Sequence, residues 1–247
     1  MQEITGSTAE EKRLIKAIQR AIGALDNGVI GTDTMTSIAA RVGADCWPIA
    51  VKMYGQPTVI AQSVIPFDPN GTIRGYEYTI SGSFTEPSGV TPCSILVDRG
   101  KVVFGQACHY WTDRKPESVI FQTATGKLGA KRVLQVSELP LDIRWAVGGM
   151  GLLGLYNPVE EGFTGIQASA LRKTTHTVLG FKNGLVYGIC FLNHTAEELN
   201  SIVRDRFKLD AAIMLDGGSP FCYNLAHMTS GLSKPCGYAI QFIEGAK

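Results

Sequence analysis

From about residue 76 onward, short runs of β-prone residues alternate with turn residues. Strand and hairpin candidates are "YEYTI" (76–80), "CSILVDRGKVVFGQA" (93–107), "ESVIFQTA" and "KRVLQVSEL". In the second run, Asp98-Arg99-Gly100 predicts a turn. The clearest hairpin is "HTVLGFKNGLVYGICFL" (176–192), because two alternating runs flank Asn183-Gly184, a pair that favours a type I′ turn.

One helix interrupts these strands. In "NHTAEELNSIVRDRFKL", Thr195 and Glu198 have the spacing of a capping box, and apolar residues from Leu199 to Phe207 fall on one face. The next run, "AAIML" (211–215), predicts a buried strand that ends at Asp216. The fold class expected is therefore α+β: a mixed, largely antiparallel β-sheet domain with few helices. Asp216 is placed at the edge of a sheet, where clefts commonly form.

The first 45 residues predict a different, helical unit. Leu14, Ile15, Ile18 and Ile22 recur at helical spacing, and "DNG" at 26–28 indicates a turn. A second helix is expected to begin at Thr32 or Asp33. The prolines of 46–75 indicate a linker with one or two strands. The expected organisation is a helical module (1–45), a linker (46–75) and a main domain (76–247).

Composition and charge exclude several classes of protein. The 247 residues are 45% hydrophobic and carry a net charge of +1, without a basic stripe or an acidic tail. Neither a nucleic-acid polymer nor an anionic membrane is therefore an expected partner. The polar N-terminus lacks the pattern of a signal peptide, and the apolar run 145–156 is too short to span a bilayer. We expect a cytoplasmic protein, or one released from a host or phage particle without a signal peptide.

The six cysteines have no zinc-ligand spacing, and we expect mostly reduced, buried thiols. Cys222 and Cys236 flank a loop and could bridge in an oxidising compartment. The cysteines are Cys46, Cys93, Cys108, Cys190, Cys222 and Cys236.

The stretch "AAIMLDGGSPF" (211–221) poses a chemical question, because a carboxylate and two glycines follow a buried strand. Residues without Cβ let backbone N–H groups approach a ligand, and successive N–H groups can hold an anion. Asp216 could then act beside a phosphate or sugar oxygen, with the Ser219 hydroxyl adding a contact. The alternative is a tight turn that Asp216 caps with its own carboxylate.

This stretch resembles the "LDGGGSS" loop of the phosphodiester glycosidase family, the family of the lysosomal uncovering enzyme. Three further blocks occur in the family's order: "YTISGSF" (78–84), "RWAVGGMGLL" (144–153) and "THTVLGFKNGLVYGICF" (175–191). The resemblance covers residues 76–243. The N-terminal stretch 12–43 is similar to the helical peptidoglycan-binding module of cell-wall hydrolases and phage lysins, which suggests a bacterial or phage source.

Carried over block by block, the resemblance assigns a site. Its members would be Ser81, Gly82, Ser83 and Phe84 at one wall, Gly148 and Gly149 at another, His176 and Thr177 on the hairpin, and Asp216, Gly217, Gly218 and Ser219 in the loop. The chain departs from the family at three positions. Ser81 stands where the family has Asn, His176 stands where it has Arg, and the third glycine of the loop is missing. Arg172 could supply the charge that a family arginine would give to a phosphate contact.

The activity implied is hydrolysis of a glycosyl (sugar-1-phosphate) phosphodiester. Asp216 would stabilise an oxocarbenium-like centre or activate water, and His176 with the glycine backbone would hold the phosphate. Glycosidases commonly use a second carboxylate, for which Glu77, Glu86 and Asp142 are candidates, and His109 and His227 could contribute. No cofactor and no resident metal are expected, although a divalent cation at Asp216 is left open.

Three hypotheses follow for the whole chain. The first is a hydrolase of a bacterial surface glycan, which the N-terminal module would bring to the cell wall. The second is a hydrolase of a soluble nucleotide-type molecule. The third is a non-catalytic protein that binds a phosphate, nucleotide or glycan ligand on the same fold, as a ligand sponge or a phage structural component.

Overall fold

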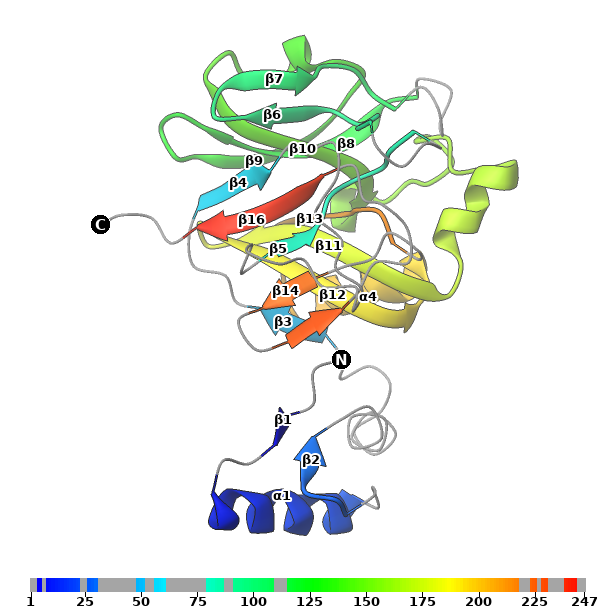
Figure 1. Cartoon of the computed structure of the whole chain (residues 1–247). Helices are drawn as coiled ribbons and strands as arrows, with labels where there is room; N and C mark the ends of the chain where they lie inside the picture. Colours follow the sequence, from blue (N-terminus) through cyan, green and yellow to red (C-terminus); the bar gives the residue numbers. More distant parts are fainter. Residues whose placement is uncertain are drawn as a thin grey trace.

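The computed structural model describes residues 4–5, 8–22, 26–30, 48–51, 56–60, 79–86, 91–108, 115–217, 223–225, 228–230 and 238–243. Within this part of the chain every strand pair is antiparallel, and the helices are few. The predicted fold class, α+β with a largely antiparallel sheet and a helix near the N-terminus, is therefore confirmed (Figure 1). No described helix is both long and apolar enough to cross a membrane.

The larger sheet has nine strands, and its central strands carry the candidate site. Seven strands follow the order β3-β12-β11-β13-β10-β6-β7, while β8 pairs with β10 and β9 pairs with β8. Their bounds are β3 (Pro48–Val51), β12 (Leu185–His194), β11 (Thr174–Lys182), β13 (Ala211–Met214), β10 (Ile143–Leu152), β6 (Leu96–Asp98), β7 (Lys101–Phe104), β8 (Glu117–Thr123) and β9 (Leu128–Val133).

A smaller sheet of five strands packs against one face of the larger sheet. Its order is β15 (Met228–Ser230), β14 (Tyr223–Leu225), β5 (Thr79–Ser81), β16 (Ala239–Ile243) and β4 (Gln56–Ile60). Ile80, Ile240 and Phe242 meet Leu179 and Ile213 in one buried cluster. Burial of apolar side chains between the two sheets is the main force that holds these layers together.

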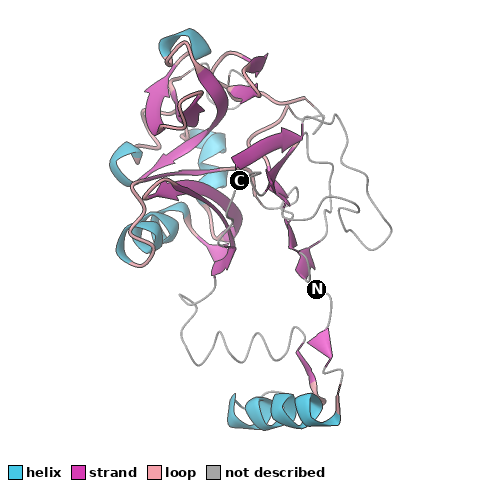
Figure 2. Ribbon diagram, turned by 90° about the vertical axis from the view of Figure 1, so that its left-hand side faces the viewer, coloured by secondary structure: helices cyan, strands magenta, loops and turns pink. Residues whose placement is uncertain are grey.

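Helix α4 (Ala196–Asp205) covers the opposite face of the larger sheet. The predicted capping box is present: Thr195 Oγ1 accepts from Glu198 N at 3.2 Å, and Thr195 N donates to Glu198 Oε2 at 2.7 Å. Leu199, Ile202 and Val203 are buried against the even-numbered residues of β13. Figure 2, coloured by secondary structure, shows the few helical turns among the strands. Three 3-10 helices complete this part: η2 (Val136–Glu138), η3 (Leu153–Leu155) and η4 (Gly165–Leu171).

Both predicted hairpin turns are confirmed. Asn183 and Gly184 join β11 to β12 with φ of 50° and 76°, and Arg99 and Gly100 join β6 to β7 with φ of 50° and 78°. Positive φ at both central residues is the backbone that a type I′ turn requires.

The segment 46–75 contributes two strands, as its β-prone runs indicated. β3 pairs with β12 of the larger sheet, and β4 pairs with β16 of the smaller sheet. This segment, predicted as a linker, thus supplies a strand to each sheet. The division of the chain into 1–45, 46–75 and 76–247 stays a prediction.

Near the N-terminus, α1 (Ala9–Ile22) adjoins a short pair of strands, β1 (Ile4–Thr5) and β2 (Val29–Ile30). Gln19 is buried and closes the predicted turn, because its Oε1 accepts from Gly28 N at 2.9 Å. The helix predicted from Thr32 or Asp33 lies outside the described residues.

A buried ion pair fixes the loop after β10. Glu161 is fully buried, and its carboxylate accepts from Gly151 N at 2.8 Å and from Ser118 Oγ at 2.5 Å. Arg132 Nε lies 3.3 Å from Glu161 Oε1, and Arg132 also donates to the Leu155 carbonyl and to Glu160. Burial raises the pKa of Glu161, and these donors oppose the shift.

We predict that Arg132→Ala lowers the free energy of unfolding by about 3–5 kcal/mol, because it leaves the Glu161 carboxylate buried without its cation. Chemical denaturation measures the change. Arg144→Ala, which removes an exposed arginine from β10, is the matched control and should cost less than about 1 kcal/mol. Equal losses in the two variants would contradict this role of the ion pair.

Candidate functional site

The segments from the four sequence blocks meet where β13 ends. Leu215 N donates to the Thr177 carbonyl at 2.8 Å, and Asp216 N donates to the Gly82 carbonyl at 3.2 Å. The hydroxyls of Ser81 and Thr177 share a hydrogen bond of 2.8 Å, which links the smaller sheet to the larger one. Asp216 therefore lies at the junction of the two sheets.

Glycines at this junction are required by close backbone approach. A Cβ at Gly217 would collide with the Thr175 carbonyl oxygen, and one at Gly82 would overlap the Tyr238 ring. A Cβ at Gly149 would lie 2.6 Å from the Met214 carbonyl oxygen. These glycines let three segments come together around Asp216, and a larger residue would push them apart.

Asp216 as a residue is partly exposed, and its carboxyl lies in a densely packed part of the fold. Burial raises the pKa of Asp216 to about 7, and the Gly217 N–H, which donates to Asp216 Oδ1 at 2.8 Å, opposes the shift. A carboxyl that changes protonation near neutral pH suits general acid–base chemistry.

The hydrogen bond from Gly217 N–H to Asp216 Oδ1 corresponds to the capped turn, in which Asp216 accepts from the backbone of its own loop. In the other alternative this N–H would contact a bound phosphate. Gly218 and Ser219 lie outside the described residues.

His176 and Thr177 are neighbours on β11, and their side chains go to opposite faces of the sheet because strand residues alternate. Thr177 faces the smaller sheet through Ser81. His176 is buried, and its Nε2 lies 3.1 Å from the Arg172 carbonyl oxygen. Burial lowers the pKa of His176 and so disfavours the protonated ring. The ring contacts the turn at Arg172, and the phosphate contact expected of His176 stays a prediction.

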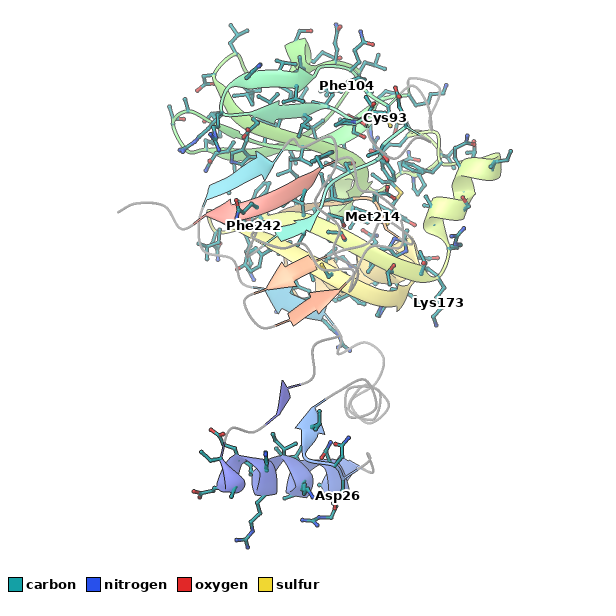
Figure 3. The ribbon with its side chains drawn as sticks, viewed as in Figure 1. Asp26, Cys93, Phe104, Lys173, Met214 and Phe242 are labelled. Atoms are coloured by element: carbon teal, nitrogen blue, oxygen red, sulfur yellow. The ribbon has the colours of Figure 1, made fainter. Side chains whose placement is uncertain are left out.

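Of the other predicted site residues, some are buried in the wall formed by residues 81–84 and one is exposed at the surface. Ser83 Oγ donates to Ser94 Oγ at 3.4 Å, and Phe84 packs against Phe163 with ring centroids 5.4 Å apart. Arg172 is exposed, as is its neighbour Lys173, which projects outward in Figure 3. Arg172 is thus an exposed cation at the end of η4, two residues before β11.

A buried carboxyl at Glu117 was missed in the sequence. Its Oε1 accepts from Ile95 N at 2.5 Å, and its Oε2 accepts from Cys108 N at 3.3 Å. Burial raises the pKa of Glu117 to about 8, and the hydrogen bond from the Ile95 N–H opposes this shift. The side chain lies over Gly148, where a Cβ would collide with Oε1. The one available signal was Gly148, whose missing Cβ makes room for the carboxyl.

The earlier candidates for a second carboxylate have different surroundings. Asp142 is exposed in the turn before β10, and Glu86 is partly exposed, with its backbone N donating to the Thr91 carbonyl at 2.9 Å. Glu77, His109 and His227 lie outside the described residues. Within the part of the chain that the structure describes, no three His, Cys, Asp or Glu side chains are arranged to hold a metal ion.

Comparison with solved structures shows the same fold in several proteins. The catalytic domain of zebrafish N-acetylglucosamine-1-phosphodiester alpha-N-acetylglucosaminidase, auto-inhibited by its pro-peptide, is 12% identical with a TM-score of 0.53, covering 75% of this chain and 71% of that one. A hypothetical protein from Synechocystis is 12% identical with a TM-score of 0.51, and the match spans 78% of this chain but only 58% of the other.

A putative exported protein from Burkholderia pseudomallei is 10% identical with a TM-score of 0.50, over 76% of this chain and 71% of that chain. No protein-family model matches the sequence, and no curated protein matches it. The chain therefore has the fold of a phosphodiester glycosidase catalytic domain, and these likenesses show that fold alone.

We predict that Gly217→Ala displaces Asp216 and lowers the free energy of unfolding by about 1–3 kcal/mol, because the new Cβ collides with backbone at Thr175. The matched control is Gly154→Ala, where a Cβ meets nothing within 4 Å. Thermal unfolding of both variants checks the prediction. If Gly217→Ala unfolds at the same temperature as the wild type, the segments at Gly217 and Thr175 are farther apart than described, which would contradict the prediction.

Proposed function

We propose that this protein is a hydrolase that cleaves a glycosyl phosphodiester at the sugar carbon, with Asp216 as the reacting carboxyl. One observation carries the proposal. Burial raises the pKa of the Asp216 carboxyl to about 7, and Asp216 lies where all four sequence blocks converge. The fold shared with a phosphodiester glycosidase catalytic domain supports the same reaction class.

Cleavage of a glycosyl phosphodiester depends mainly on a carboxylate. Water attacks the sugar carbon, the bond from that carbon to the phosphate oxygen breaks, and a phosphomonoester leaves with the electron pair. Asp216 accepts the proton from the water and stabilises the positive charge that develops on the sugar. Because a phosphomonoester is a good leaving group, a strong general acid is not required.

The phosphate contact is proposed for Arg172 in place of His176. A guanidinium stays charged at every physiological pH and can give two parallel hydrogen bonds to a phosphate. Arg172 is exposed, whereas His176 is buried and neutral, with its ring at the Arg172 carbonyl. In this scheme His176 positions the turn that presents Arg172.

Glu117 is proposed as a positioning residue. Both of its oxygens already accept backbone N–H groups, from Ile95 and Cys108, so the carboxyl group holds two segments beside the site. A reacting carboxylate needs an oxygen available to substrate or water.

A second candidate function is ligand binding without turnover, on the same fold. The observation that favours it is the neutral, buried His176 at the position of the family's arginine. The proposed hydrolase has two candidate substrate classes, a bacterial surface glycan and a soluble nucleotide-type molecule.

Phosphorus NMR tests turnover directly. The wild-type chain and Asp216→Asn are incubated with a nucleotide-sugar, an N-acetylglucosamine phosphodiester, teichoic acid and a cyclic nucleotide. We expect a new phosphomonoester signal with the wild type, a rate that falls below about pH 7 as Asp216 becomes protonated, and a loss of at least about 100-fold in Asp216→Asn.

The control for folding is the unfolding temperature of Asp216→Asn, which should not fall below that of the wild type because the amide removes a buried ionisable group. Equal turnover in the folded variant would refute the role of Asp216. Ligand signals broadened by both proteins, with no product, would identify the binding protein instead.

A further inference from the structure

Two buried thiols lie against each other in the apolar cluster that contains Met214, the last residue of β13. Cys93 Sγ and Cys108 Sγ are 3.0 Å apart, only about 1 Å longer than a disulfide bond. Both residues are almost fully buried, at 0% and 1% exposure. Figure 3 marks Cys93 beside β6. Two side chains this close need only a small rotation to be joined.

The surrounding structure holds the two cysteine-bearing segments in place. Glu117 accepts from Ile95 N, two residues after Cys93, and from the backbone N of Cys108 itself. Gly148 N donates to the Ile95 carbonyl at 2.7 Å, and Ala107 N donates to the Leu134 carbonyl at 2.7 Å. The backbone on both sides of the pair is thus anchored to the larger sheet.

The pair also adjoins the candidate site. Cys93 N donates to the Phe84 carbonyl at 3.1 Å, and both cysteines pack in the cluster that contains Phe84, Met150 and Phe163. The charges of Glu117 and Asp216 add to the effects of the Cys108 contact and of burial, which come first in raising the pKa of Cys93. Cys93 therefore lies within electrostatic reach of Asp216.

We propose that Cys93 and Cys108 form an intramolecular disulfide that fastens the Phe84-bearing wall of the candidate site to the segment before β8. The oxidant is a small-molecule disulfide. One protein thiolate attacks it and expels a thiolate, and the second protein thiolate attacks the mixed disulfide and expels another. Two protein thiols are oxidised, the small disulfide is reduced to two thiols, and the protein's two protons pass to the expelled thiolates.

Burial sets when the bond forms. Thiols enclosed in an apolar cluster are protonated and poorly accessible, so exchange in the folded chain is slow. The bond therefore forms while the chain folds in an oxidising environment, and once formed it is protected from reductants.

Peptide mapping tests the pairing on the full chain. The protein is refolded in a buffer of oxidised and reduced glutathione, alkylated and digested with trypsin, which cuts after Arg74, Arg99, Lys101 and Arg114. We expect peptides 75–99 and 102–114, which contain Cys93 and Cys108, to be recovered joined. Recovery of both peptides alkylated, or joined to a peptide with another cysteine, would overturn the proposal.

Thermal unfolding gives a second readout. The bond closes a loop of roughly 15 residues, and we expect the oxidised protein to unfold on the order of 5–10 °C above its reduced form. The oxidised-minus-reduced difference should fall by that amount in Cys93→Ala and stay unchanged in Cys190→Ala, a matched change at a buried cysteine of β12. A difference as large in Cys93→Ala as in the wild type would assign the stabilisation to other cysteines and contradict the proposal. The peptide map on the wild type does not depend on either variant folding.

Discussion

The close approach of backbones at the end of β13 is the constraint on which the rest of this site depends. β13 runs between β11 and β10, and after its end Asp216 N donates to the carbonyl of Gly82, the residue that follows β5 of the smaller sheet. Side chains cannot fit where Gly217 meets Thr175 and where Gly82 meets Tyr238. Glycine is therefore required at positions 217 and 82, because the backbones at the sheet junction approach too closely for a Cβ. Burial raises the pKa of the Asp216 carboxyl to about 7, and the hydrogen bond from the Gly217 N–H opposes that shift.

The alternation of side chains along each strand determines which face of the sheet each polar group occupies. On β11, Thr177 faces the smaller sheet and His176 faces the opposite side, so two adjacent residues of one motif serve different layers. The same rule places Glu117 of β8 over Gly148 of β10, on the face that carries the two cysteine segments. Phe84, packed against Phe163, lies in the same apolar cluster as Met214 of β13, and Arg172 is exposed two residues before β11.

The features that depend on local spacing could be predicted from the sequence. The turns at Asn183-Gly184 and Arg99-Gly100 and the capping box at Thr195 are set by residues within four positions of one another. The orientation of His176 and the burial of Glu117 could not be predicted, because both depend on partners far along the chain or on a bulge in the strand. β11 has such an irregularity between Thr174 and His176. The pairing of β3 and β4 with two different sheets was equally non-local.

The proposed role of Asp216 depends most directly on the surroundings of its carboxyl, and titration measures their effect. Carbon-13 NMR of the aspartate carboxyls, with the Asp216 signal assigned by its loss in Asp216→Asn, gives the pKa. We expect a value of about 7. Folding then favours the protonated form, so stability falls as pH rises from about 4 to about 7 and is level above that range. A pKa near 4, the ordinary value for an aspartate, would show a solvated carboxyl and contradict the site as described.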